Sequence, residues 1–157
     1  MMLKLLISKL DAMGLKYDNE KLSVMAMSHN AHLKNNLEVT ETKSGICFET
    51  RPLVCEIAEQ LKLRNELFFM KFSSKNGTYI YRHAMSVVYD PSHQRWAAVE
   101  FNGVHDFWIP VMQSRSCEDV LDIFAKENDV KLIKRIDPRM LNQQQTDLYT
   151  YFQQMTA

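Results

Sequence analysis

Residues 81–101, YRHAMSVVYDPSHQRWAAVEF, are the stretch that decides the fold. Runs rich in β-branched, aromatic and small apolar residues flank the turn sequence Asp90-Pro91-Ser92-His93. Proline, aspartate and serine favour tight turns, and such a turn between two apolar runs is typical of a β-hairpin. The sequence therefore predicts two antiparallel strands here.

The hairpin brings an acid close to a histidine. With residues 90–93 as the loop, Tyr89 pairs with Gln94 and His83 lies opposite Glu100. Directly opposed side chains share one face, with Cβ atoms about 5 Å apart. A carboxylate at that range orients an imidazole and raises its basicity, as an acid–base pair requires. The alternative is an ordinary hairpin in which His83 and Glu100 merely pack.

Local patterns extend this hairpin into a layered fold. Helices are predicted over residues 2–13, 19–30, 50–63, 116–127 and 143–155, and further strands over 36–42, 66–72 and 130–136. We expect an α+β fold with a mixed, mostly antiparallel sheet of four or five strands flanked by helices.

Composition limits the classes of function. With 157 residues, 46% of them hydrophobic, residues 1–157 are expected to form a single domain. Lys plus Arg and Asp plus Glu both number 19, so no bulk charge favours nucleic acid or an anionic membrane. No apolar run approaches the roughly 18 residues of a membrane span, and no signal-peptide pattern is found. We expect a cytoplasmic protein, or one exported into a host cytosol without a classical signal peptide. A protein partner or substrate is expected, and the oligomeric state is open.

The three cysteines are an odd number without metal-ligand spacing, so neither a disulfide scaffold nor a metal site is predicted. Cys47 is a candidate nucleophile because it lies just before the predicted helix 50–63, and a helix N-terminus lowers a thiol pKa. A small buried residue is the alternative. Cys117, after the predicted N-cap Ser116, is a second candidate, and Cys55 is expected in the core.

The segment around Cys47, SGICFE at residues 44–49, resembles the Gly-Gly-x-Cys-x-Glu segment of arylamine N-acetyltransferases. The order Cys47, His83, Glu100 is also the order in that family and in transglutaminase-like and papain-like enzymes. The chain departs from the arylamine N-acetyltransferase pattern at Ser44, at Arg51, where asparagine is usual, and at Glu100, where aspartate is usual. It is also much shorter than those enzymes.

The hairpin also resembles the His-to-acid segment of adenovirus-type and SUMO-protease-type cysteine peptidases. It is most similar to that of the YopJ group of secreted bacterial effectors, which are acetyltransferases on that peptidase fold. Residues 18–27, 29–40 and 67–71 follow the order of elements in that family, and His83 and Glu100 fall on its histidine and acid.

This second resemblance implies a cysteine-protease-like fold without the C-terminal extension of YopJ-type effectors. It places Thr146 where the family has its nucleophilic cysteine, and Gln143 is the nearest candidate for an oxyanion glutamine. Threonine is a poor replacement, because its hydroxyl stays protonated near neutral pH.

Three functions are therefore expected as alternatives. The first is a YopJ-like effector that has lost its nucleophile and acts by binding proteins. The second is an active thiol acyltransferase or cysteine hydrolase that uses Cys47, His83 and Glu100, with acetyl-CoA as a candidate cofactor. The third is a non-catalytic α+β interaction module.

Overall fold

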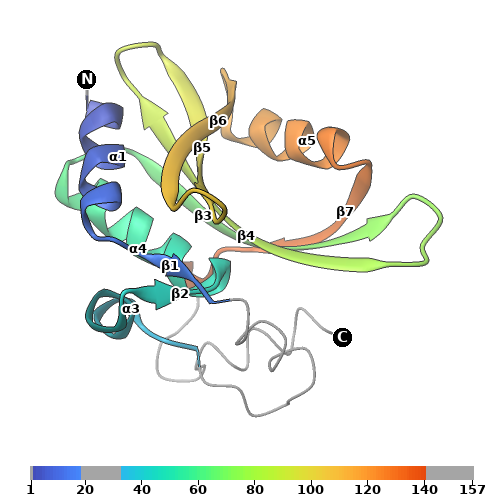
Figure 1. Cartoon of the computed structure of the whole chain (residues 1–157). Coiled ribbons are helices and arrows are strands. Elements are labelled where there is room, and N and C mark those ends of the chain that lie inside the picture. The colour runs from blue at the N-terminus through green and yellow to red at the C-terminus, as the bar shows by residue number, and fades with distance from the viewer. Residues whose placement is uncertain (1, 19–32, 141–157) are drawn as a thin grey trace.

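The computed structural model describes residues 2–18 and 33–140 (Figure 1). The predicted helices 19–30 and 143–155 lie outside these residues, as do Gln143 and Thr146.

A five-stranded antiparallel sheet forms the centre of the structure, with the strand order β6-β5-β4-β3-β7. Its strands are β3 (Asn65–Ser74), β4 (Ile80–Asp90), β5 (Arg95–Asn102), β6 (Phe107–Ser114) and β7 (Val130–Ile136). The two-residue strands β1 (Lys16–Tyr17) and β2 (Ser44–Gly45) pair in parallel beside it. The predicted α+β class with a mostly antiparallel sheet is confirmed.

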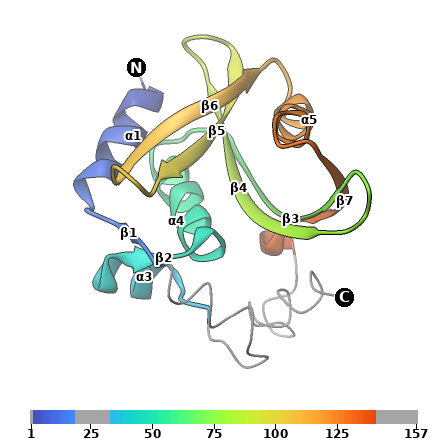
Figure 2. The same ribbon diagram turned by 45° about the vertical axis from the view of Figure 1, so that its right-hand side comes forward.

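Helices cover both faces of the sheet (Figures 1 and 2). The described helices are α1 (Met2–Ala12), α3 (Asn36–Thr42), α4 (Cys47–Gln60) and α5 (Cys117–Glu127). α4 lies against β3 and β4, and α1 packs beside it against β4 and β6. α5 lies on the other side, in the curve of the sheet, against β5, β6 and β7.

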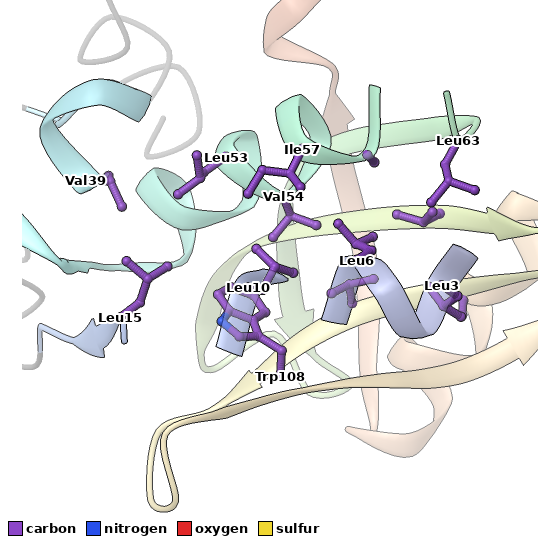
Figure 3. Packing of buried hydrophobic residues seen from close by; sticks show 14 residues of the cluster. Leu3, Leu6, Leu10, Leu15, Val39, Leu53, Val54, Ile57, Leu63 and Trp108 are labelled. Atoms are coloured by element: carbon purple, nitrogen blue, oxygen red, sulfur yellow. The ribbon is translucent and has the colours of Figure 1, made fainter. Parts of the chain in front are cut away.

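The core on the α4 side is built from leucine and valine side chains at helical spacing. Leu6 and Leu10 of α1 belong to one buried cluster with Val54 and Ile57 of α4, and Trp108 of β6 joins them (Figure 3). Each such side chain contributes about 1.5–3 kcal/mol on full burial. This cluster holds α4 on the sheet and thereby positions the N-terminus of α4.

The hairpin forms as predicted, but the predicted register is wrong by two residues. The loop comprises residues 91–94, so that Asp90 pairs with Arg95 and Tyr89 with Trp96. Gln94 has φ 51°, a left-handed conformation that suits a turn and not a strand. The Asp90 carboxylate also accepts a hydrogen bond from the Ser92 N–H at 3.0 Å, which closes the turn after Asp90.

Residues 36–42 form helix α3 and not the predicted strand. The Asn35 side chain accepts a hydrogen bond from the Glu38 N–H at 2.9 Å, and the Glu38 carboxylate accepts one from the Asn35 N–H at 3.3 Å. These two bonds are a capping box, which starts a helix. Apolar alternation over so short a segment is the weaker signal.

Candidate active site

Helix α4 begins at Cys47, three residues before the predicted start at Thr50. The buried carboxylate of Glu49 causes the earlier start, because its Oε1 accepts a hydrogen bond from the Ile46 N–H at 3.0 Å. Its Oε2 accepts a second bond, 2.6 Å long, from the Lys34 N–H. Cys47 therefore lies in the first turn of the helix, where the N–H groups have no acceptor within the helix and favour a negative charge.

His83 and Glu100 meet despite the error in register. The β4–β5 ladder runs from Asp90 with Arg95 to Ser86 with Val99, and its pairs do not include His83 or Glu100, so the predicted direct pairing of these two residues is wrong. A shift of two residues leaves both side chains on the predicted face, because side chains alternate with a period of two. The His83 Nε2 lies 3.2 Å from the Glu100 Oε1, and both side chains are about one-fifth exposed, at 22% and 18%.

The thiol of Cys47 lies near enough to His83 for the imidazole to shift its pKa as a hydrogen-bond partner and as a charge. Since Nε2 of the ring faces Glu100, the ring nitrogen that remains for the thiol is Nδ1. Burial alone would raise the pKa of Cys47. The bond to His83, the charges of His83 and Arg51 and the backbone of Ala84 outweigh burial and lower that pKa. The nucleophile, the base and the acid of the predicted set are therefore connected in one chain.

The histidine and the acid shift in the matching directions. Burial would lower the pKa of His83, but the Glu100 carboxylate and the hydrogen bonds to Cys47 and Glu100 raise it to about 9. Burial would raise the pKa of Glu100, but the charges of Arg51 and His83 lower it to about 2. Between these values Glu100 is a carboxylate and His83 is an imidazolium, so the thiol is stabilised as a thiolate.

Arg51, which departs from the arylamine N-acetyltransferase pattern, holds the acid in place. Its Nη2 donates to the Glu100 Oε2 at 2.9 Å, and its Nη1 donates to the Thr50 hydroxyl at 2.9 Å. The guanidinium lies 5.1 Å from the ring centroid of Trp108, and only 5% of the side chain is exposed. A buried ion pair needs such additional bonds to offset the cost of desolvation. Sequence reasoning noted Arg51 only as a substitution and did not predict this role.

Two aromatic residues that sequence reasoning did not connect with the site lie next to it. Phe124 of α5 stacks on the His83 ring, with the centroids 4.9 Å apart and the planes within 2° of parallel. Burial raises the pKa of Tyr17 in β1, and a negative charge on Cys47 raises it further. Tyr17 therefore lies within electrostatic range of the thiol. No sequence motif links Tyr17 or Phe124 to the site, because both lie far from Cys47, His83 and Glu100 in the sequence.

His83 is not among the groups that shift the pKa of either of the other two cysteines. Cys117 is half-buried in the first turn of α5, where burial and then the charges of Glu66 and Glu118 raise its pKa to about 12. Cys55 is buried in the middle of α4, as predicted, and its thiol lies 3.8 Å from the Glu66 carbonyl. Cys117 is thus not the thiol beside His83. Thr146 and Gln143 are outside the described residues.

Residues 2–18 and 33–140 contain no group of three or more histidine, cysteine or acidic side chains that could hold a metal ion. No helix in this part of the chain has the length and apolarity needed to cross a membrane.

No protein-family model matches the chain, and no curated protein matches it in sequence. The chemistry of Cys47, His83 and Glu100 is therefore the basis for the function proposed for this protein.

Proposed function

We propose that the protein is a cysteine-dependent enzyme of acyl transfer, either a hydrolase or an acyltransferase, that forms a thioester on Cys47. The observation that carries the proposal is the connected set Cys47, His83 and Glu100, with the thiol in the first turn of α4. A thiol at a helix N-terminus beside an imidazole that an acid orients is the arrangement that nucleophilic catalysis requires.

The first half of the reaction forms the acyl-enzyme. The Cys47 thiolate attacks the carbonyl carbon of a thioester, ester or amide, and a carbon–sulfur bond forms while the carbonyl electrons move to oxygen. The N–H of Cys47, at the open end of α4, is a donor for this oxyanion. The His83 imidazolium gives its proton to the leaving group as the bond to that group breaks.

The second half releases the acyl group. His83, now neutral, takes a proton from water or from an acceptor amine or hydroxyl, which attacks the thioester on Cys47. The carbon–sulfur bond breaks and the thiolate returns. Throughout, Glu100 and Arg51 keep the imidazole in its orientation, because the pKa of Glu100 is about 2 and its carboxylate stays charged.

The contact between Cys47 and His83 favours this function over that of a protein-binding effector without a nucleophile. The latter prediction depends on Thr146 as the replacement for cysteine. A thiol that already contacts the proposed base makes such a replacement unnecessary. Acetyl-CoA, the candidate cofactor of an active enzyme, is therefore the first acyl donor to test.

The test is to trap the acyl-enzyme. The full chain is incubated with acetyl-CoA and, in parallel, with p-nitrophenyl acetate as a small activated ester. Both reactions are quenched in acid, and the intact protein mass is measured by mass spectrometry. We expect a gain of one acetyl group that peptide mapping assigns to Cys47. The gain should persist in Cys117→Ala and disappear in Cys47→Ala. Acetylation that survives Cys47→Ala, or no mass gain with either donor, would contradict the proposal.

A further inference from the structure

A hollow of about 680 Å³ lies at the β4–β5 turn. Its wall carries three arginines and a histidine: Arg64 from just before β3, His93 from the turn, Arg95 from the start of β5 and Arg115 from just after β6. No residue of its lining is acidic. The volume is within the usual range of sites for small ligands.

Within residues 2–18 and 33–140, no acidic side chain forms an ion pair with the guanidinium groups of Arg64, Arg95 and Arg115. The acidic side chain adjoining the turn is Asp90, and its carboxylate is already bound by the His93 Nδ1 at 2.6 Å and by the Ser92 N–H. The chain as a whole has no net charge, so the positive charge here is a local concentration.

Arg64 is held in position before any ligand arrives. Its guanidinium lies 5.1 Å from the ring centroids of both Tyr89 and Trp96, in cation–π geometry. Its carbonyl accepts a hydrogen bond from the Tyr89 N–H at 2.9 Å, which anchors the backbone as well. A group held in this way loses less freedom on binding a ligand.

We propose that this hollow binds a compact ligand that carries several phosphate groups. Guanidinium groups bind phosphate oxygens through two parallel hydrogen bonds, and three of them around one hollow suit a ligand with more than one phosphate. Trp96 is buried and Tyr89 largely so, so the hollow offers charged edges and little aromatic face. The phosphate groups, and not a planar ring, are therefore the part that is recognised.

This site is distinct from the one that contains Cys47. His83 and Tyr89 are six residues apart along β4, which corresponds to about 20 Å at the rise of a β-strand. Binding in the hollow consequently needs neither the thiol nor the imidazole. Phosphate binding in the hollow therefore does not depend on acyl transfer at Cys47.

The test is calorimetric titration of the full chain with inorganic tripolyphosphate at constant ionic strength. We expect saturable binding of one equivalent. Arg95→Gln and Arg115→Gln should each weaken binding at least about tenfold, since each removes charge-assisted hydrogen bonds. Both side chains are exposed, so these variants should fold normally. A thermal unfolding curve for each variant verifies the fold.

Lys131→Gln is the matched control, because it removes one exposed positive charge from β7, at the other edge of the sheet. It should leave the affinity unchanged, and Cys47→Ala should do the same. Equal losses in Lys131→Gln and Arg95→Gln would overturn the proposal, because they would show an unspecific charge effect. Citrate bound as tightly as tripolyphosphate, or no saturable heat with tripolyphosphate, would also overturn it.

Discussion

Helix α4 contains two cysteines with opposite chemistry, eight residues apart. Cys47 and Cys55 are both buried, with 6% and 2% of their surface exposed. Burial raises the pKa of each thiol, and at Cys55 it prevails and raises the pKa to about 12. At Cys47 the pKa is instead lowered. Burial alone therefore does not decide whether a thiol in this protein is reactive.

The partners at the two places make the difference. Cys47, in the first turn of α4, has the imidazole of His83 as a hydrogen-bond partner and the guanidinium of Arg51 nearby. Cys55, in mid-helix, belongs to the same buried apolar cluster as Cys47, and its thiol lies 3.8 Å from the Glu66 carbonyl oxygen. A positive charge and a helix end stabilise a thiolate, whereas an apolar core stabilises the thiol.

Replacing the two thiols in turn gives the largest expected contrast. Cys47→Ala should reduce hydrolysis of p-nitrophenyl acetate to the uncatalysed rate, because no nucleophile remains beside His83. Cys55→Ala should keep nearly the full rate. The measurement is the rate of p-nitrophenol release at a saturating concentration of the ester and the same concentration of each variant. If both variants lost activity equally, the difference between the two thiols of α4 would have no catalytic meaning.

Removing the imidazole should have the next largest effect. His83→Ala should lower the rate by about 10²–10⁴-fold, the usual contribution of general acid–base catalysis. The matched control is His93→Ala, since His93 is also bonded to an acid, Asp90, but lies at the exposed turn. We expect His93→Ala to hydrolyse the ester at the normal rate. An unchanged rate in His83→Ala would remove His83 from the mechanism.

Alkylation compares the two thiols without any substrate. At pH 7, iodoacetamide should modify Cys47 more than about tenfold faster than Cys55 or Cys117, because only Cys47 has a lowered pKa. Peptide mapping after graded times of exposure gives the three rates. Cys55 serves as the control for access, since it is about as deeply buried as Cys47. Equal rates for Cys47 and Cys55 would show that the charged partners do not activate the thiol.

Neutralising Glu100 should change the pH profile. Activity needs the thiolate and the imidazolium together, so in the unaltered protein it should decline as the pH rises through about 9, where His83 loses its proton. Glu100→Gln removes the charge that raises the pKa of His83, and the alkaline limb should move from about 9 towards 6.5. Initial rates between pH 5 and 10 test this. A profile that did not move would mean that Glu100 does not set the charge of the imidazole.

The two replacements should differ least in their effect on stability, and here Cys55→Ala should have the larger effect. Cys55→Ala removes a well-packed core side chain and should lower the free energy of unfolding by about 1 kcal/mol. Cys47→Ala should cost less, because it also removes the need to bury a charged thiolate. Urea unfolding of both variants gives the two values. A larger loss for Cys47→Ala would indicate that the site stabilises the fold instead of straining it.

The hairpin was predictable because its signals are local. Alternating apolar residues around Asp90 and Pro91 indicate two strands, and the common face of His83 and Glu100 survived an error of two residues, since the side-chain period is also two. The register itself depends on the left-handed conformation of Gln94. Glutamine has no preference for that conformation, so the sequence does not indicate it. For α3, the sequence carries both the capping signal of Asn35 and Glu38 and a short apolar alternation, and the capping box decides the structure.

The candidate site was only partly predictable. Cys47, His83 and Glu100 were named from residue type and order, but so were Cys117 and Thr146, and no local rule separated the cysteines. The structure separates the three cysteines, because His83 shifts the pKa of Cys47 and is not among the groups that shift those of Cys55 and Cys117. Thr146 lies outside the described residues. The bond from Arg51 to Glu100 and the stacking of Phe124 on His83 were not predicted, because these residues come from α4 and α5, which approach the hairpin from opposite faces of the sheet.

By itself, the sequence determined the α+β class, the hairpin, three of the four helices in the described residues and the residue types that suit thiol chemistry. These features follow from periodicity and turn preferences along a short stretch of chain. Only the tertiary structure decided which thiol meets the imidazole and what holds the acid. Those contacts join residues 36 and 49 positions apart, and they depend on how α4 packs against the sheet.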